Sequence, residues 1–183
     1  GVGGAIGLLA PGNSLVGSSA NDRVGLAITA LDNGNYVVIS ERWSNGPATS
    51  AGAVTFGSGV AGVSGAVGAG NSLVGSTLND RVGSAGVAAL TNGNYVVGSP
   101  FWDNAATIDA GAATLCTGTA GASGPVAPGN SLVGSQVSDR VGSAVLALRS
   151  GNYVVASPRW DNGALIDAGA ATFGSGSSGV VGA

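Results

Sequence analysis

The stretch LTNGNYVV, residues 90–97, decides the fold class. Its Asn92-Gly93 pair tolerates a positive φ at both positions of a tight turn, which makes it a strong β-hairpin signal. The Tyr-Val-Val run that follows is made of residue types that favour strands. The same pattern recurs at Asn33-Gly34, and Ser150-Gly151 takes its place in a third copy. Three such hairpins predict an all-β protein.

The whole sequence repeats around these hairpins with a spacing of 58 or 59 residues. The phrase GNSLVG begins at residues 12, 70 and 129, DRVG at 22, 80 and 139, NYVV at 35, 94 and 152, and AGA at 51, 110 and 168. We therefore divide the chain into unit 1 (1–58), unit 2 (59–117) and unit 3 (118–175), with 176–183 as the start of a further unit.

Each unit is predicted to hold four short antiparallel strands. In unit 3 we expect strands at 141–148, 153–157 and 168–173, and an edge strand in the opening segment 124–133. Repeated four-stranded units predict β-propeller-like blades, and a β-solenoid or fibre-forming repeat array stays open as the alternative. Units so rich in Gly, Ala and Ser bury little apolar area alone, so we expect contacts between neighbouring units to supply much of the stability.

The composition excludes several classes of function. The 183 residues include 35 Gly, one Cys and no His, and the net charge is −3. Without His there is no His-containing triad and no His-ligated metal site. The negative balance argues against nucleic acid as a partner, and no apolar run reaches the roughly 18 residues that membrane insertion by a helix needs. We expect a protein that is not an enzyme and carries no cofactor.

An Asp-Arg pair is the only charge pattern present in all three units. Its members are Asp22-Arg23, Asp80-Arg81 and Asp139-Arg140. Because an enzyme seldom needs three copies of a catalytic residue, we interpret the carboxylate as a cap for backbone amides in a turn and the Arg as a bridge to the adjacent unit. A ligand contact or an acid site is the alternative interpretation.

A Trp seven residues after each repeated Tyr marks the candidate binding loops. The residues that could contact a ligand there, for example by stacking on a sugar, are Trp43, Trp102, Asp103, Asn104, Trp160, Asp161 and Asn162. The same Trp side chains are also candidates for the core or for the seams between units. The oxygen ligands that a calcium ion would need could come from Asp103, Asp109, Asp161 and Asp167. The acids two residues apart that are typical of calcium loops are missing, so Asx turns account for these residues equally well.

Two families of repeats resemble this sequence. The run from Val82-Gly83 through 94–100 (NYVVGSP) to 109–112 (DAGA) resembles the FG-GAP repeat of integrin-type β-propellers, which implies a four-stranded blade. Unit motifs such as NSLVGS, DRVGS, LTNGNYVV and AGA resemble the tandem repeats of large secreted bacterial proteins, including filamentous-haemagglutinin-like proteins. That second resemblance spans nearly the whole chain and implies an extracellular or cell-surface location with a structural or adhesive role.

Together these observations predict a segment of a surface filament or adhesin that associates with copies of itself. The alternative is a carbohydrate-binding, lectin-like module whose ligands are cell-surface glycans and whose sites are the Trp-Asp-Asn loops. The partial unit 176–183 favours an array that continues, in a longer chain or through other copies.

Overall fold

A computed structural model describes residues 7–182, which form fourteen short strands and no helix. The first main sheet holds β2 (Ala27–Ala30), β3 (Tyr36–Ser40), β4 (Ala53–Gly57), β6 (Ser72–Val74) and β10 (Gly124–Pro125). The second holds β7 (Val87–Ala89), β8 (Tyr95–Ser99), β9 (Ala112–Cys116) and β11 (Leu132–Val133). The third holds β12 (Ala144–Ala147), β13 (Tyr153–Ser157) and β14 (Ala170–Gly174). A small fourth sheet pairs β1 (Leu15–Val16) with β5 (Gly65–Ala66).

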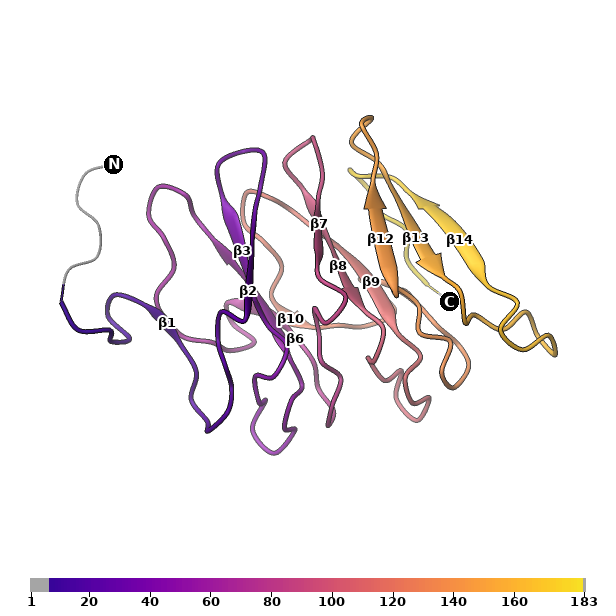
Figure 1. Ribbon diagram of the computed structural model, residues 1–183, viewed down its shortest axis with the longest axis horizontal. Coiled ribbons are helices and arrows are strands. Elements are labelled where there is room, and N and C mark those ends of the chain that lie inside the picture. Colours follow the sequence, from indigo (N-terminus) through magenta and orange to yellow (C-terminus); the bar gives the residue numbers. More distant parts are fainter. Residues whose placement is uncertain (1–6, 183) are drawn as a thin grey trace.

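The main sheets stand one after another along the long axis of the molecule (Figure 1), so that β1 lies toward one end and β14 at the other. This row is open, and within residues 7–182 no sheet closes into a barrel. The prediction of an all-β protein with repeated units is confirmed. The part of the chain that the structure describes has no helix long and apolar enough to cross a membrane.

Each complete sheet takes its fourth strand from the next unit. β6 pairs antiparallel with β4, and β11 pairs in the same way with β9. β5 and β10 then pair parallel with β1 and β6, so consecutive units are joined by backbone hydrogen bonds on both sides of the shared strand.

The predicted strand 124–133 is two separate strands, β10 and β11. Asn130 breaks it, because its Oδ1 accepts the Ala127 N–H at 2.9 Å and its Nδ2 donates to the Pro125 carbonyl at 3.0 Å. These bonds close a turn between the two strands. β10 therefore pairs with one sheet and β11 with the next.

The hairpin turns differ in type from the sequence prediction. Gly34 has a φ of 85° and Asn33 does not have a positive φ, while the Gly34 N–H donates to the Leu31 carbonyl at 3.0 Å. This is a three-residue loop with a left-handed glycine at its end, a common hairpin connection. Because Asn33 is not needed for a left-handed backbone, its side chain can bond to another unit.

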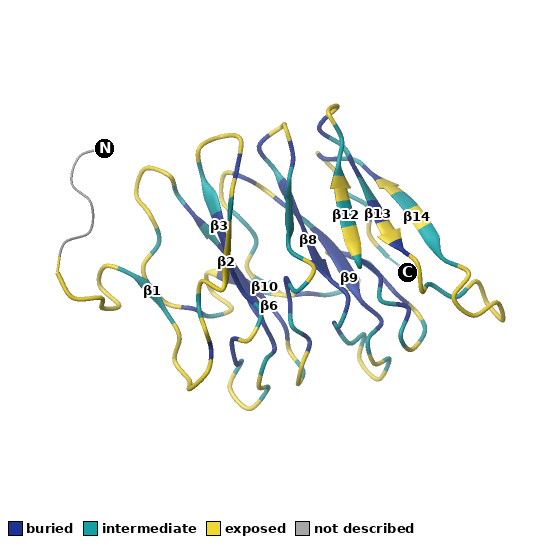
Figure 2. Cartoon of the chain, viewed as in Figure 1, coloured by how far each residue is buried: buried dark blue, intermediate teal, exposed yellow. Residues whose placement is uncertain are grey.

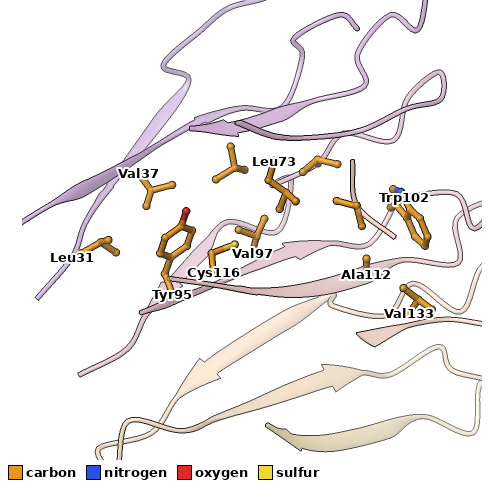
Figure 3. Close-up of a cluster of buried hydrophobic side chains, with 12 residues drawn as sticks. Leu31, Val37, Leu73, Tyr95, Val97, Trp102, Ala112, Cys116 and Val133 are labelled. Carbon is orange, nitrogen blue, oxygen red and sulfur yellow. The ribbon is translucent and has the colours of Figure 1, made fainter. Parts of the chain in front are cut away.

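The core lies between the sheets. Val37, Val54 and Phe56 on the first sheet pack against Tyr95 and Val97 on the second, as part of one buried cluster (Figure 3). A second cluster repeats this arrangement one sheet further along the row. Burial is deepest on β8 and β9 in the middle, while β12 and β14 carry exposed residues (Figure 2). The main apolar contacts of each unit are therefore with its neighbours.

Cys116 occupies a position that is glycine in the other two units. A Cβ at Gly57 or Gly174 would overlap the ring of Tyr36 or Tyr153. In unit 2 the ring of Tyr95 lies beside Cys116 in the core instead (Figure 3). Burial raises the pKa of the Cys116 thiol to about 12, and burial is also the main cause that raises the pKa of Tyr95.

Alkaline solution is expected to destabilise the protein through this pair. The unfolded thiol ionises near its ordinary pKa of 9.0, whereas the folded thiol keeps its proton up to a pKa of about 12. The stabilisation is therefore complete below pH 9 and is lost as the pH rises through 12, at about 1.4 kcal/mol per pH unit for one group. Urea unfolding at pH 8, 10 and 11 measures this slope. Cys116→Ala, which removes the thiol, should flatten the slope between pH 9 and 10; an unchanged slope would contradict the assignment.

Candidate functional site

The repeated aspartates are buried and fully hydrogen-bonded. Asp80 is 0% exposed, and its Oδ2 accepts the N–H groups of Ser76 at 2.7 Å and Thr77 at 2.8 Å. Its Oδ1 accepts the N–H of Asp103 at 3.0 Å. The counterparts Asp22 and Asp139 each accept three equivalent backbone N–H groups. Each carboxylate therefore ties the opening loop of its unit to the Trp loop of the same unit.

The arginines that follow face the preceding unit. Arg81 and Arg140 have left-handed backbones, and their N–H groups donate to the carbonyls of Ser50 and Asp109, each at 3.1 Å. The guanidinium of Arg140 also pairs with the Asp109 carboxylate at 3.1 Å. Both guanidinium carbons lie over the ring of Phe101, 5.8 and 5.1 Å from its centre, within the range of a cation–π contact.

Two of the three predicted Trp platforms are buried at seams between units. Trp43 and Trp102 are 4% and 3% exposed, and they belong to clusters that include Val74 and Val133, which sit on the shared fourth strands. A sugar needs an exposed indole face for stacking, and these two indoles offer almost none.

Trp160 differs because its sheet lacks the fourth strand in the described residues. It is partly exposed and lines an apolar cavity of about 220 Å³. The other lining residues are Leu132, Val133, Val141, Ser157, Ala170 and Thr172.

The polar residues of the Trp loops are used in bonds within the protein. The Oδ1 of Asp103 accepts the Asp109 N–H at 2.8 Å, and Asp161 binds the Asp167 N–H in the same way at 2.8 Å. The Nδ2 of Asn104 reaches the next unit and donates to the Gly134 carbonyl at 3.2 Å. Asn162 bonds through its backbone to Leu165. These loops are closed by their own side chains and held against the following unit.

The calcium candidates do not converge into an ion-binding cluster in residues 7–182. In unit 2 the Asp103 carboxylate meets the backbone N–H of Asp109, while the Asp109 carboxylate faces Arg140. A backbone amide and a guanidinium thus take the oxygens that a cation would use.

The asparagines of the hairpin turns form a contact that sequence reasoning missed. Asn33 and Asn35 of unit 1 donate to the Gly118 carbonyl at 2.6 and 2.8 Å, and Asn94 of unit 2 accepts the Gly118 N–H at 3.0 Å. A Cβ at Gly118 would overlap the carbonyl oxygen of Gly93, so only glycine fits there. Asn92, Asn94 and Asn152 hold Gly176 in the same way. The signal in the sequence was the recurrence of Asn-x-Asn beside a glycine in phase with the repeat.

The fold and these contacts define a tandem-repeat β protein whose recurring polar residues join unit to unit. A family described as a repeat of unknown function (DUF5650) matches residues 1–26, 30–84, 89–143 and 147–183, and the chain belongs to that family. The last three matched copies start 59 and 58 residues apart, the spacing found in the sequence. The copy 30–84 contains β3, β4 and β6 together, so one copy of the family repeat corresponds to the paired strands of one sheet. No curated protein matches the chain.

Proposed function

We propose that this chain is a non-enzymatic structural segment of an extracellular filament or adhesin, in which stacked units act as a rigid spacer. The observation that carries the proposal is the use of the recurring polar side chains. Asp80 holds amides within its unit, whereas Arg140, Asn33 and Asn104 bond to neighbouring units. A binding or catalytic repeat would keep such groups free for a ligand.

Of the two architectures left open by the sequence, we propose the fibre-forming array over the propeller. The open row of sheets in Figure 1 supports this choice, because the two ends of the row lie far apart. The extracellular location, the adhesive role and the association with copies of itself belong to the same proposal. They rest on the likeness of the unit motifs to repeats of large secreted bacterial proteins.

Small-angle X-ray scattering on the chain and on a fusion of two copies tests the spacer role. An open array should lengthen in equal steps as units are added, with an unchanged cross-section. A maximum dimension that stays constant in the fusion would indicate ring closure and overturn the proposal. A glycan array probed with the chain adds the alternative outcome, since binding that Trp160→Ala abolishes would favour the carbohydrate-binding module.

A further inference from the structure

The two ends of the row are unfinished in complementary ways. At one end β14 pairs with β13 but has no fourth strand, whereas β4 and β9 each have one. At the other end β1 pairs with β5 along one edge only, whereas its counterpart β6 is paired along both edges. One end therefore lacks the strand that the other end presents.

We propose that a second copy of this chain supplies the missing strand. Residues 13–16 of one copy add to β14 of another, antiparallel, with Ser14 opposite Thr172, Leu15 opposite Ala171 and Val16 opposite Ala170. This register copies the two junctions inside the chain, where Thr55 lies opposite Ser72 and Ala113 opposite Leu132. The proposal rests on the structural role proposed above and specifies its partner and its joint.

The hydroxyl groups at the joint match those of the internal junctions. Thr55 and Ser72 share a buried hydrogen bond of 2.7 Å between their Oγ atoms, and Thr114 and Ser131 share one of the same length. Thr172 and Ser14 are the corresponding residues at the two ends. A docked second copy would bring them together.

The apolar residues match as well. In the internal junctions Trp43 clusters with Val67 and Val74, and Trp102 clusters with Val126 and Val133. By position in the repeat, Leu9 and Val16 are the counterparts of these two valines. Leu9 is 79% exposed and Trp160 lines an open cavity. The incoming copy would place Leu9 and Val16 against Trp160 and fill that cavity.

The charges at the two ends are also complementary. Arg140 and Asp109 form the ion pair of the junction between units 2 and 3. Arg23 and Asp167 hold the corresponding positions, and both have the same left-handed backbone as their counterparts, with φ of 48° and 52° in the internal pair and 46° and 51° at the ends. The joint would therefore repeat this ion pair, which is absent from the junction of Ser50 with Arg81.

The outer face of the last sheet is the surface that the second copy would cover. Leu146, Val154 and Phe173 lie side by side across β12, β13 and β14, and Leu146 and Phe173 are 65% and 61% exposed. The counterparts of Phe173 in the earlier sheets are Phe56 and Leu115. Both are covered by the following unit, since Gly121 lies against Phe56 and Gly179 against Leu115.

A cysteine trap tests the register. In a Cys116→Ala background, Ser14→Cys chains are mixed with Thr172→Cys chains in a glutathione redox buffer, and covalent dimers are measured by gel electrophoresis. We expect at least tenfold more cross-linked dimer in the mixture than in either variant alone. Thr114→Cys with Ser131→Cys in one chain is the positive control, because their side chains already meet. Leu15→Cys mixed with Thr172→Cys is the matched control, since neighbouring strand residues point to opposite faces.

Sedimentation velocity of the unmodified chain over a range of concentrations completes the test. Growth in mass with concentration, together with the specific cross-link, supports the joint. Absence of the cross-link while the internal control closes overturns it. In that case continued growth in mass would leave the structural role standing with another contact surface, whereas a chain that neither associates nor lengthens in the scattering experiment would remove both proposals.

Discussion

Asp80→Ala is expected to lower the free energy of unfolding by about 3–5 kcal/mol, because it leaves three buried backbone N–H groups without an acceptor at about 1–3 kcal/mol each. Those amides belong to Ser76, Thr77 and Asp103, in two different loops of the unit. The loss should therefore loosen the opening loop and the Trp loop together. Chemical denaturation followed by Trp fluorescence measures the effect.

Asp32→Ala is the matched control for this prediction. Asp32 is an exposed aspartate of the first hairpin turn, and we expect its replacement to change stability by less than about 0.5 kcal/mol. Asp80→Asn should lie between the two, because the amide keeps one acceptor oxygen but turns an NH₂ group toward N–H donors. Equal effects of Asp80→Ala and Asp32→Ala would show that the buried carboxylate does not hold the loops.

Trp102→Ala is expected to cost about 3–5 kcal/mol, the usual range for removing a buried Trp side chain. Trp102 is 3% exposed and clusters with Ala112, Val126 and Val133, which come from its own sheet and from the following unit. The cavity left behind would lie at the seam between units 2 and 3. Both the global stability and the docking of unit 3 should therefore suffer.

Trp160→Ala provides the comparison within the same repeat. Because Trp160 is already partly exposed beside an open cavity, we expect a loss of only about 1–2 kcal/mol in dilute solution. Urea midpoints of the two variants test the difference. A loss as large as that of Trp102→Ala would mean that the third unit is as tightly packed as the second, contrary to the burial of these side chains.

The sequence predicted the units and most strands correctly. β13 occupies residues 153–157 as expected, since Tyr-Val-Val is bounded by turn residues on one side and by Pro158 on the other. It did not predict the division of 124–133, because that depends on where the Asn130 side chain finds its partners. It also left ring and row undecided. The period of a repeat defines the unit, whereas the rotation between units depends on packing contacts such as Phe56 against Gly121.

The candidate site was predictable in kind and not in its partners. A recurring Asp beside turn residues indicates an amide cap. That the third amide would come from the Trp loop, 23 residues from Asp80, follows only from the fold. The role of Asn33 was hidden for the same reason, because the Gly118 carbonyl that it binds is 85 residues away in the chain.

The strand that each sheet shares with the next unit also determines how such an array can evolve in length. A gain or loss of one whole repeat of 58 or 59 residues leaves every sheet with its borrowed strand, and brings together the same Asn, Gly, Thr and Ser positions at the new junction. A deletion of half a repeat would strand one sheet with an open edge, which is a known liability for aggregation. Selection should therefore tolerate changes in copy number far better than changes in the length of a single copy.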